Sequence, residues 1–495
     1  MDRLAADYPD VHVVPDHGID DPFVTVIAPG SDLLRLATEP GVANVTTSID
    51  ESEAELEPAA SHFNATENFG WLNLFGIKGN GVTVSVIEGE GYWDSVANLS
   101  GYPTGSCIDI YNTHFACSDP TLAPIGAHPR AAASIIRNSV PSVAEAAPEV
   151  TLIKGASEHG LVAATNWSLT QGARVFNRST ADPGHTAQKP HELYTDYIAM
   201  WHPYAPVIAA SAGNKGVGNR VGHRLHNGLI VGGSDDSPIQ DTVAIWNDNP
   251  IDGSQSVNTN GTKGWELPHL VAQAKKVDWA GAAPGTIGAS SGTSWSAPQV
   301  AGAAARILGH NPTLNGWNVA VMAGLMASAY NIDGPELDLA DNVDDRDGAG
   351  LLDALAAVQT LAANAKRDGG NAPAQYGHDY EFVTPSSFPV GTWHPEIYYA
   401  YVPAGKTLKI ASVMFAPALC SDNTGPCPAS PIPLHWLHVT APGFTKVVGN
   451  TSQGYQFAAI KNTTGTDQTY TIRLIMTNWA GAHLSKRGLA WHVRG

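Results

Sequence analysis

A serine lies between a glycine turn and an alanine-rich stretch in the segment 291–298, Ser-Gly-Thr-Ser-Trp-Ser-Ala-Pro. The hydroxyl of Ser294 could act there as a nucleophile. The run 299–308 has mostly small side chains and predicts a helix close beside a sheet, and Pro298 suits its first turn. A helix N-terminus also favours negative charge nearby. Because a serine hydroxyl is inert at neutral pH, the prediction requires a general base and an oxyanion donor elsewhere in the chain.

A histidine at the start of a second alanine-rich stretch could supply the general base. His128 is followed by Pro129 and by the run 130–136, which is typical of a helix. Imidazole titrates near neutral pH, so His128 could take the proton of the Ser294 hydroxyl and return it to a leaving amine. The alternative is that His128, one of 19 histidines, only caps a helix.

The orienting carboxylate is expected at the end of a buried strand. Residues 79–91 read as a turn, a β-branched strand and a glycine-rich strand end, where functional residues of open α/β sheets gather. Glu88 ends this strand. Glu90 and Asp94 compete for the same role, but each would depend on a loop to hold it in place, so Glu88 is preferred.

An amide for the oxyanion site follows another apolar strand pattern, residues 207–213. The side chain of Asn214 could donate to a tetrahedral intermediate together with the backbone N–H of Ser294. The alternative is an ordinary Gly-Asn turn. The strand pattern before Asn214 favours the first interpretation.

In their order along the chain, these segments resemble the motifs of the subtilisin-like serine proteases, the subtilases. The resemblance covers residues 60–360. It implies an α/β fold with a mostly parallel sheet flanked by helices, a serine endopeptidase activity, and Asn214 as the oxyanion residue. The family has aspartate where this chain has Glu88. Glutamate is longer by one methylene, so the strand end or the helix of His128 must be displaced to accommodate it.

The resemblance also implies a substrate cleft. Residues 147–154 resemble a core strand of the family, and residues 172–179 resemble the strand that borders the cleft. By that match, six small residues would line the primary side-chain pocket: Ser179, Thr180, Ala181, Ser211, Ala212 and Gly213. None is charged, and main-chain pairing with an extended peptide selects weakly by sequence. The expected partner is therefore a protein or peptide substrate of no stated preference.

Two other functions remain open at this point. A sedolisin-like acid peptidase would use Glu90 and Asp94, but that family replaces the histidine by glutamate and has aspartate at the oxyanion site. His128 and Asn214 both argue against it. The other alternative is a non-catalytic pseudoprotease that binds proteins, for which the glutamate at position 88 is the only positive sign.

Composition excludes some classes of partner. The chain of 495 residues has 27 basic and 46 acidic residues and a formal charge of −19, which argues against a nucleic-acid partner. No apolar run approaches the length of a membrane span, so no membrane partner is expected, and we expect a monomer. The first residues are not followed by an apolar segment, so no signal peptide is visible.

The four cysteines form two local pairs, Cys107 with Cys117 and Cys420 with Cys427. Each pair bounds a loop, a spacing that suits two loop-closing disulfides. Pairing would indicate a secreted or extracytoplasmic protein. The alternative is four free thiols in a cytosolic enzyme.

Four parts are expected along the chain. Residues 1–60 resemble the end of the family's propeptide, with a strand at 24–28 and a short helix at 32–37, and residues 61–365 would form the catalytic domain. Residues 366–385 have the composition of a linker. Residues 386–495 contain the β-like runs 398–401, 407–415, 435–440 and 469–476, which predict an all-β sandwich. The run 401–408 resembles an edge of the pre-peptidase C-terminal domains of secreted proteases.

A cluster of aspartates precedes the last helix expected in the catalytic domain: Asp341, Asp344, Asp345 and Asp347. Clustered carboxylates repel one another unless they are neutralised, so a structural calcium ion is one interpretation, and a solvated acidic loop is the other. The predicted chemistry itself requires no cofactor.

Overall fold

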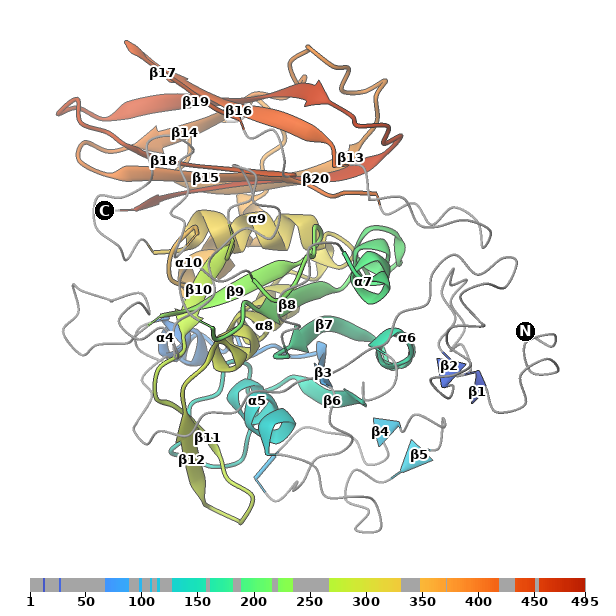
Figure 1. Ribbon diagram of the computed structural model, residues 1–495. Coiled ribbons are helices and arrows are strands. Elements are labelled where there is room, and N and C mark those ends of the chain that lie inside the picture. The colour runs from blue at the N-terminus through green and yellow to red at the C-terminus, as the bar shows by residue number, and fades with distance from the viewer. Residues whose placement is uncertain are drawn as a thin grey trace.

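The computed structural model describes residues 12–13, 26–27, 67–88, 98–99, 107–108, 114–115, 127–156, 161–180, 188–215, 221–234, 267–330, 348–370, 372–417, 432–449 and 454–494. A domain of helices around a central sheet lies below a β-sandwich in Figure 1, with helix α9 (Asn318–Ser328) at the boundary. The expected mixed architecture is confirmed.

The central sheet has eight strands in the order β10-β9-β8-β7-β3-β6-β4-β5. All neighbours are parallel except β4 and β5. The strands are β3 (Thr83–Glu88), β4 (Cys107–Ile108), β5 (His114–Phe115), β6 (Thr151–Ala156), β7 (Ala173–Arg178), β8 (Val207–Ser211), β9 (Leu229–Ser234) and β10 (Leu270–Gln273). Strands β8, β9 and β10 are buried along their whole length, as the continuous apolar runs of a parallel sheet require.

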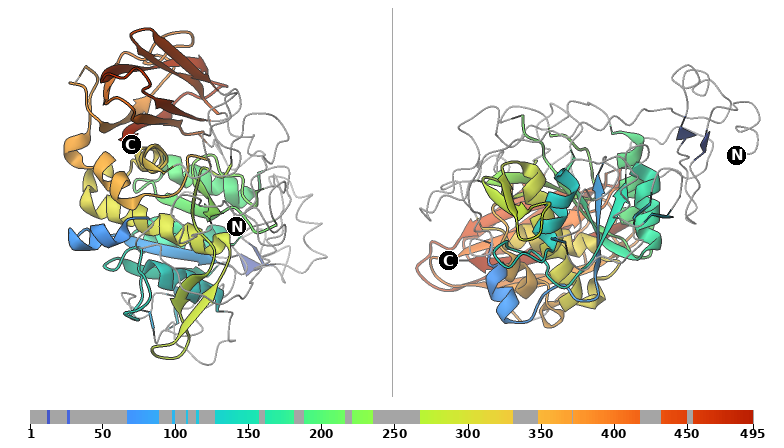
Figure 2. Two further views of the ribbon diagram at one scale, coloured as in Figure 1. Left: turned by 90° about the vertical axis from the view of Figure 1, so that its left-hand side faces the viewer. Right: turned by 90° about the horizontal axis from the view of Figure 1, so that it is seen from below.

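Helices cover both faces of this sheet (Figure 2). On β3, Ser85 shares a hydrogen bond of 2.7 Å with Ser168 of α6 (Leu161–Thr170), whereas Glu88 contacts His128 of α5 (His128–Ile136). Side chains alternate along a strand, so α5 and α6 lie on opposite faces. The remaining helices of this domain are α4 (Phe69–Leu74), α7 (Pro190–Trp201), α8 (Thr293–His310) and α10 (Ala354–Thr360), with short 3-10 turns at Pro312–Leu314 and Ala363–Ala365.

Small residues let α8 pack closely against its neighbours. The methyl group of Ala146 fills the space where a side chain on Gly302 would lie, so any larger residue at 302 would force the helix outwards. The hairpin β11 (Val277–Ala280) and β12 (Ile287–Ser290) precedes α8. This close packing fixes the N-terminus of α8 relative to the strand ends.

Two four-stranded antiparallel sheets form the sandwich, which confirms the predicted all-β C-terminal part. One has the order β13-β20-β15-β18 and the other β14-β19-β16-β17. Their bounds are β13 (Tyr376–Val383), β14 (Tyr398–Val402), β15 (Thr407–Met414), β16 (Leu434–Ala441), β17 (Phe444–Gly449), β18 (Tyr455–Lys461), β19 (Gln468–Asn478) and β20 (Ser485–Arg494).

The expected linker at 366–385 is wrong over its second half, because β13 lies within it and pairs with β20. Residues that suggest a loop have specific contacts there. Gly377 lies where an added Cβ would come within 2.6 Å of the Trp491 ring, and the Asp379 carboxylate pairs with Arg487 at 2.8 Å. The sandwich therefore begins earlier than residue 386.

The sandwich is bonded directly to the first domain. Buried Lys409 of β15 donates from Nζ to the carbonyl oxygens of Ala329 and Ala349, each at 2.6 Å. Ala329 is the C-terminal cap of α9, where a cation also interacts favourably with the helix dipole. A Cβ on Gly488 of β20 would lie 2.6 Å from the Val319 carbonyl oxygen, so strand and helix are in close contact. The two domains are thus held together by polar bonds as well as packing.

The N-terminal part is described only as β1 (His12–Val13) paired antiparallel with β2 (Val26–Ile27). Strand β2 falls inside the expected strand at 24–28. The expected helix at 32–37 lies outside the described residues, as do the aspartates Asp341, Asp344, Asp345 and Asp347 and the side chains of all four cysteines. Propeptide, calcium and disulfides therefore stay predictions. Within the described ranges, no helix has both the length and the apolar character needed to span a membrane.

Replacing Lys409 by Met should lower the free energy of unfolding by about 1–3 kcal/mol, because two buried carbonyl oxygens lose their donor. Urea denaturation measures this change. The matched control is Lys406→Met, which removes an exposed lysine from the adjoining turn and should leave stability within about 0.5 kcal/mol of the parent. Equal effects of the two substitutions would contradict a joining role for Lys409.

Candidate active site

Glu88 and His128 meet at the carboxyl end of β3, in the middle of the sheet. The Glu88 side chain is 1% exposed, and its Oε2 lies 2.8 Å from Nδ1 of His128. His128 is the first residue of α5, and Pro129 follows it in the first turn, where a missing backbone N–H costs nothing. The longer glutamate therefore reaches the imidazole. From the sequence alone, this contact depended on a shift of the strand end or of the helix of His128.

Ser294 is the second residue of α8 and lies beside the end of β7. Its Oγ donates to the carbonyl oxygen of Ser179 at 2.8 Å, and Oγ of Ser179 donates to the carbonyl oxygen of Ser294, also at 2.8 Å. The next residue, Trp295, packs on the His128 ring with centroids 4.9 Å apart. The start of α8, the start of α5 and the end of β7 therefore converge.

Asn214, after β8, lies against the turn that begins α8. Its Oδ1 accepts from the backbone N–H of Thr293 at 2.8 Å and from the Thr293 hydroxyl at 3.0 Å. Two donors on one oxygen fix the orientation of the amide, so that Nδ2 is the outward donor. A Cβ on Gly292, whose φ is +155°, would lie 3.2 Å from that Nδ2. Glycine at 292 therefore permits the close approach of the amide.

The expected pocket residues lie at the carboxyl ends of β7 and β8, which are neighbouring parallel strands. Ser179 and Thr180 follow β7, and Ser211, Ala212 and Gly213 end or follow β8. The Thr180 carbonyl oxygen is 2.5 Å from Nε2 of buried His223. Ala181, Glu90 and Asp94 lie outside the described residues.

Two residues of the site were not anticipated from the sequence. Thr293 orients the Asn214 amide, and its Oγ1 also accepts from the backbone N–H of Gly213 at 3.0 Å. Trp295 packs on His128. Their position on either side of Ser294 was the only available signal, since both contacts join segments distant in the chain.

Comparison with known proteins finds a family match for part of the chain. Residues 125–366 match the model of the subtilase family, a segment that includes His128, Asn214 and Ser294 and begins after Glu88. No significant relative was found among curated proteins. Among solved structures, the patellamide maturation protease PatA is 19% identical with a TM-score of 0.42, covering 57% of this chain and 98% of that one. The prenylagaramide maturation protease PagA is 20% identical with a TM-score of 0.42, covering 59% of this chain and 99% of that one.

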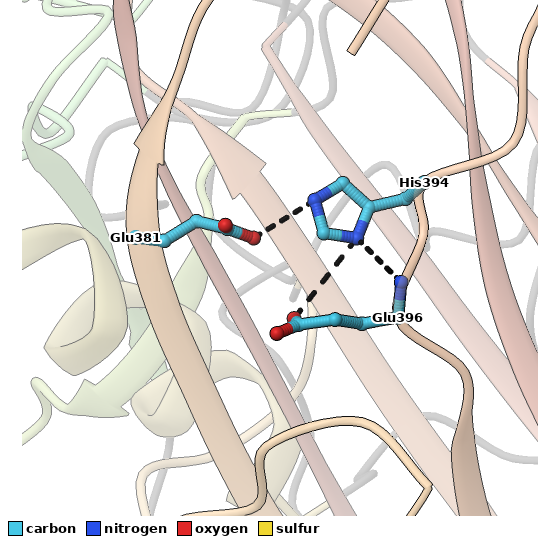
Figure 3. A group of neighbouring side chains, drawn as sticks. All are labelled: Glu381, His394 and Glu396. Atoms are coloured by element: carbon cyan, nitrogen blue, oxygen red, sulfur yellow. Dashed lines mark hydrogen bonds and ion pairs between the residues drawn. The ribbon is translucent and has the colours of Figure 1, made fainter. Parts of the chain in front are cut away.

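A second group of ionisable side chains lies in the sandwich, away from this site. Glu381, His394 and Glu396 bring three ligand atoms within 4.8 Å of one another, and they are the one such group in the described part of the chain (Figure 3). His394 donates from Nε2 to Glu381 Oε1 at 2.8 Å, and its Nδ1 accepts the backbone N–H of Glu396 at 3.3 Å. Both ring nitrogens are therefore already in use.

Arg487 bonds both glutamates of this group. Its buried guanidinium Nη2 bonds Glu381, Glu396 at 3.1 Å and Asp379 at 2.8 Å, and the Tyr398 hydroxyl lies 2.8 Å away. A guanidinium that already bonds both glutamates supplies the positive charge that a metal ion would bring, so the residues present do not fit a metal. They form an ion-pair network.

The network separates the pKa values of its two glutamates. Burial, with a hydrogen bond that the protonated Glu396 carboxyl group donates to Asp379, raises the pKa of Glu396 to about 7. Burial would also raise the pKa of Glu381, but the hydrogen bond from His394 and the charge of Arg487 outweigh it and lower the pKa to about 2. The two carboxyl groups must therefore affect stability in opposite directions as pH changes.

The free energy of unfolding of Glu396→Gln should increase relative to that of the parent protein as pH rises. Because the folded pKa of Glu396 lies above its ordinary value of 4.5, its contribution is complete below pH 4.5 and is lost as pH rises through 7. Glu381, with a folded pKa near 2, contributes above pH 4.5 and loses that contribution as pH falls through 2. Urea unfolding at pH 5 and pH 8 measures these changes. The stability of Glu396→Gln relative to the parent should be higher at pH 8 than at pH 5, whereas the control Glu381→Gln should be less stable than the parent at both pH values. Identical pH profiles for the two variants would refute the assignment.

Proposed function

We propose that this serine protease, whose residues 125–366 belong to the subtilase family, is an endopeptidase with Glu88, His128 and Ser294 as its catalytic triad. The observation that carries the proposal is the 2.8 Å contact between the buried Glu88 carboxylate and Nδ1 of His128, next to the helix that carries Ser294 in its first turn. This contact holds the ring in one tautomer, with Nε2 as the basic nitrogen.

The nucleophilic step uses both ring nitrogens. The Ser294 hydroxyl leaves the Ser179 carbonyl oxygen, to which it donates in this structure, and turns about its Cα–Cβ bond towards the imidazole. Oγ then bonds to the scissile carbonyl carbon while its proton passes to Nε2 of His128. The Glu88 carboxylate stabilises the resulting imidazolium. The same proton goes to the leaving amine as the C–N bond breaks, and water, activated in the same way, hydrolyses the acyl ester.

Negative charge on the former carbonyl oxygen would be stabilised by Nδ2 of Asn214 and the backbone N–H of Ser294 at the N-terminus of α8. The fixed orientation of the Asn214 amide supports this role, because a donor that is already positioned requires no reorganisation during the reaction. The positions of the strand ends support binding of an extended peptide beside Ser179 and Thr180, with small uncharged side chains around its primary pocket.

A pseudoprotease is the main competing interpretation. Its one positive sign was the glutamate at position 88, and the 2.8 Å contact with His128 counts against it, since a displaced carboxylate would leave the ring without its partner. Labelling by a fluorophosphonate that is lost in Ser294→Ala would support the endopeptidase. A native protein that does not label would contradict it.

Glu88→Gln and Glu88→Ala should lower kcat by about three to four orders of magnitude with little change in KM, because the imidazolium loses its carboxylate. Glu88→Asp keeps the charge but shortens the side chain, so kcat should fall by an intermediate factor. Steady-state cleavage of a fluorogenic peptide library measures both constants. Full activity of Glu88→Gln would show that another carboxylate, and not Glu88, orients His128.

Thr293→Val should lower kcat about tenfold, because the Asn214 oxygen loses one of its two donors and the amide is no longer fixed. Thr293→Ser keeps the hydroxyl and should restore most of the rate. In an Asn214→Ala background, Thr293→Val should have no further effect on kcat. Additive losses in the double variant would show that Thr293 does not act through Asn214.

A further inference from the structure

The sheet β14-β19-β16-β17 presents its outer face away from the catalytic domain, and we call this face the outer sheet surface. The other sheet of the sandwich is the one that contacts α9, as Figure 1 shows. Inward side chains of the outer sheet, such as Leu437 and Leu474, belong to the sandwich core. The outward side chains are thus not needed to fill that core.

Two tryptophans and an isoleucine form one row across this surface. Trp436 of β16 is directly opposite Ile475 of β19, and Ile475 is in turn bridged to Trp393. The Trp436 and Trp393 side chains are 39% and 43% exposed. Adjacent strands lie about 4.8 Å apart, so the backbones that carry the two indoles are separated by about 10 Å across the sheet.

Neighbouring groups hold both indole rings in place. The Trp436 ring lies over Gly449 of β17, where any Cβ would overlap the ring atoms. The Trp393 ring packs edge-to-face on His438, with centroids 5.0 Å apart, and the Arg473 guanidinium lies 5.5 Å from its centroid. Rings that are fixed before binding lose little conformational entropy when a partner stacks on them.

Two polar nitrogen atoms without hydrogen-bond partners lie in the adjacent row. His438 of β16 is directly opposite Arg473 of β19. Nδ1 of His438 and Nε of Arg473 are buried and have no hydrogen-bond partner among the described residues. Buried polar atoms are normally bonded, so these two mark a place in the sheet where the protein alone does not satisfy its hydrogen bonds.

Charge narrows the class of partner. The outward positions of the four strands carry Gly, Leu, Thr, Tyr, Trp, His, Arg, Val and Ile and no carboxylate, in a chain with a formal charge of −19, and the exposed Asp467 just before β19 is bonded to the Tyr401 hydroxyl. The net negative charge of the chain disfavours a nucleic-acid partner. A peptide added to a sheet would pair with the edge strand β17, not with side chains on the face. A neutral chain with flat apolar faces and many hydroxyl groups, which both donate and accept, fits the indoles and the polar side chains beside them.

From these observations we propose that the outer sheet surface binds a neutral β-linked polysaccharide. The C–H faces of two sugar rings would stack on Trp436 and Trp393, and sugar hydroxyl groups would hydrogen-bond to the outward ends of the His438 and Arg473 side chains. Such binding would keep the protease on a glycan matrix while the catalytic site acts on proteins within reach. The inference does not depend on the assignment of the catalytic triad.

Isothermal titration of the full chain, carrying Ser294→Ala to prevent self-cleavage, tests the proposal. The probes are cellohexaose and chitohexaose, with α-linked maltohexaose as control ligand. At least one β-linked probe should bind with a Kd below about 1 mM. Trp393→Ala and Trp436→Ala should each weaken binding about tenfold or more, since stacked aromatic anchors dominate such contacts. Gly449→Val, which pushes the Trp436 ring aside without removing it, should do the same.

The matched control is Trp71→Ala, which removes an indole that is 55% exposed on α4 of the catalytic domain. It should leave glycan binding unchanged, and the Trp393 and Trp436 variants should keep full peptidase activity when Ser294 is present. The proposal is overturned if neither β-linked probe binds, or if maltohexaose binds equally well. It is also overturned if the tryptophan variants instead raise KM for protein substrates or dissociate a dimer in sedimentation.

Discussion

The site depends on one constraint: the carboxyl end of a central buried strand must meet the N-termini of two helices. Glu88 can contact His128 only because β3 ends in the middle of the sheet, beneath the first turn of α5. Ser294 can lie beside them only because α8 packs tightly, with Gly302 against Ala146. The helix N-terminus then places backbone N–H groups where negative charge would develop. Parallel strands and small helix residues are thus requirements of the proposed chemistry as well as of the core.

Polar contacts also join the first domain to the sandwich. Lys409 and Lys486 both donate to backbone carbonyl oxygens of the first domain, at 2.6 Å and 3.0 Å respectively. Burying a lysine is costly unless its donors are satisfied, so each is stabilising only when the two domains are in contact. The sandwich is consequently part of the folded unit that carries the site. Its outer sheet, directed away from that contact, is left with exposed aromatic side chains.

The sandwich also shows how context decides the role of a charged residue. Glu381, His394 and Glu396 have the chemistry of metal ligands, yet Arg487 lies among them and bonds both carboxylates. A buried network of this kind is stable only when each charge is compensated. His438 and Arg473, on the outer surface of the same domain, are in the opposite situation, because each has a buried ring or guanidinium nitrogen with no partner among the described residues. The first group is satisfied within the protein, whereas the second is not.

The sequence by itself determined the order and type of the residues of the site, the mostly parallel sheet and the β character of the C-terminal part, because these follow from local periodicity and short motifs. It placed His128, Asn214 and Ser294 in the correct kinds of element. Only the tertiary structure decided that glutamate at 88 reaches the imidazole, that Thr293 orients Asn214, and that β13 occupies an apparent linker. Each of these depends on contacts between distant segments. Such contacts are set by strand register and helix packing, which short stretches of sequence do not encode.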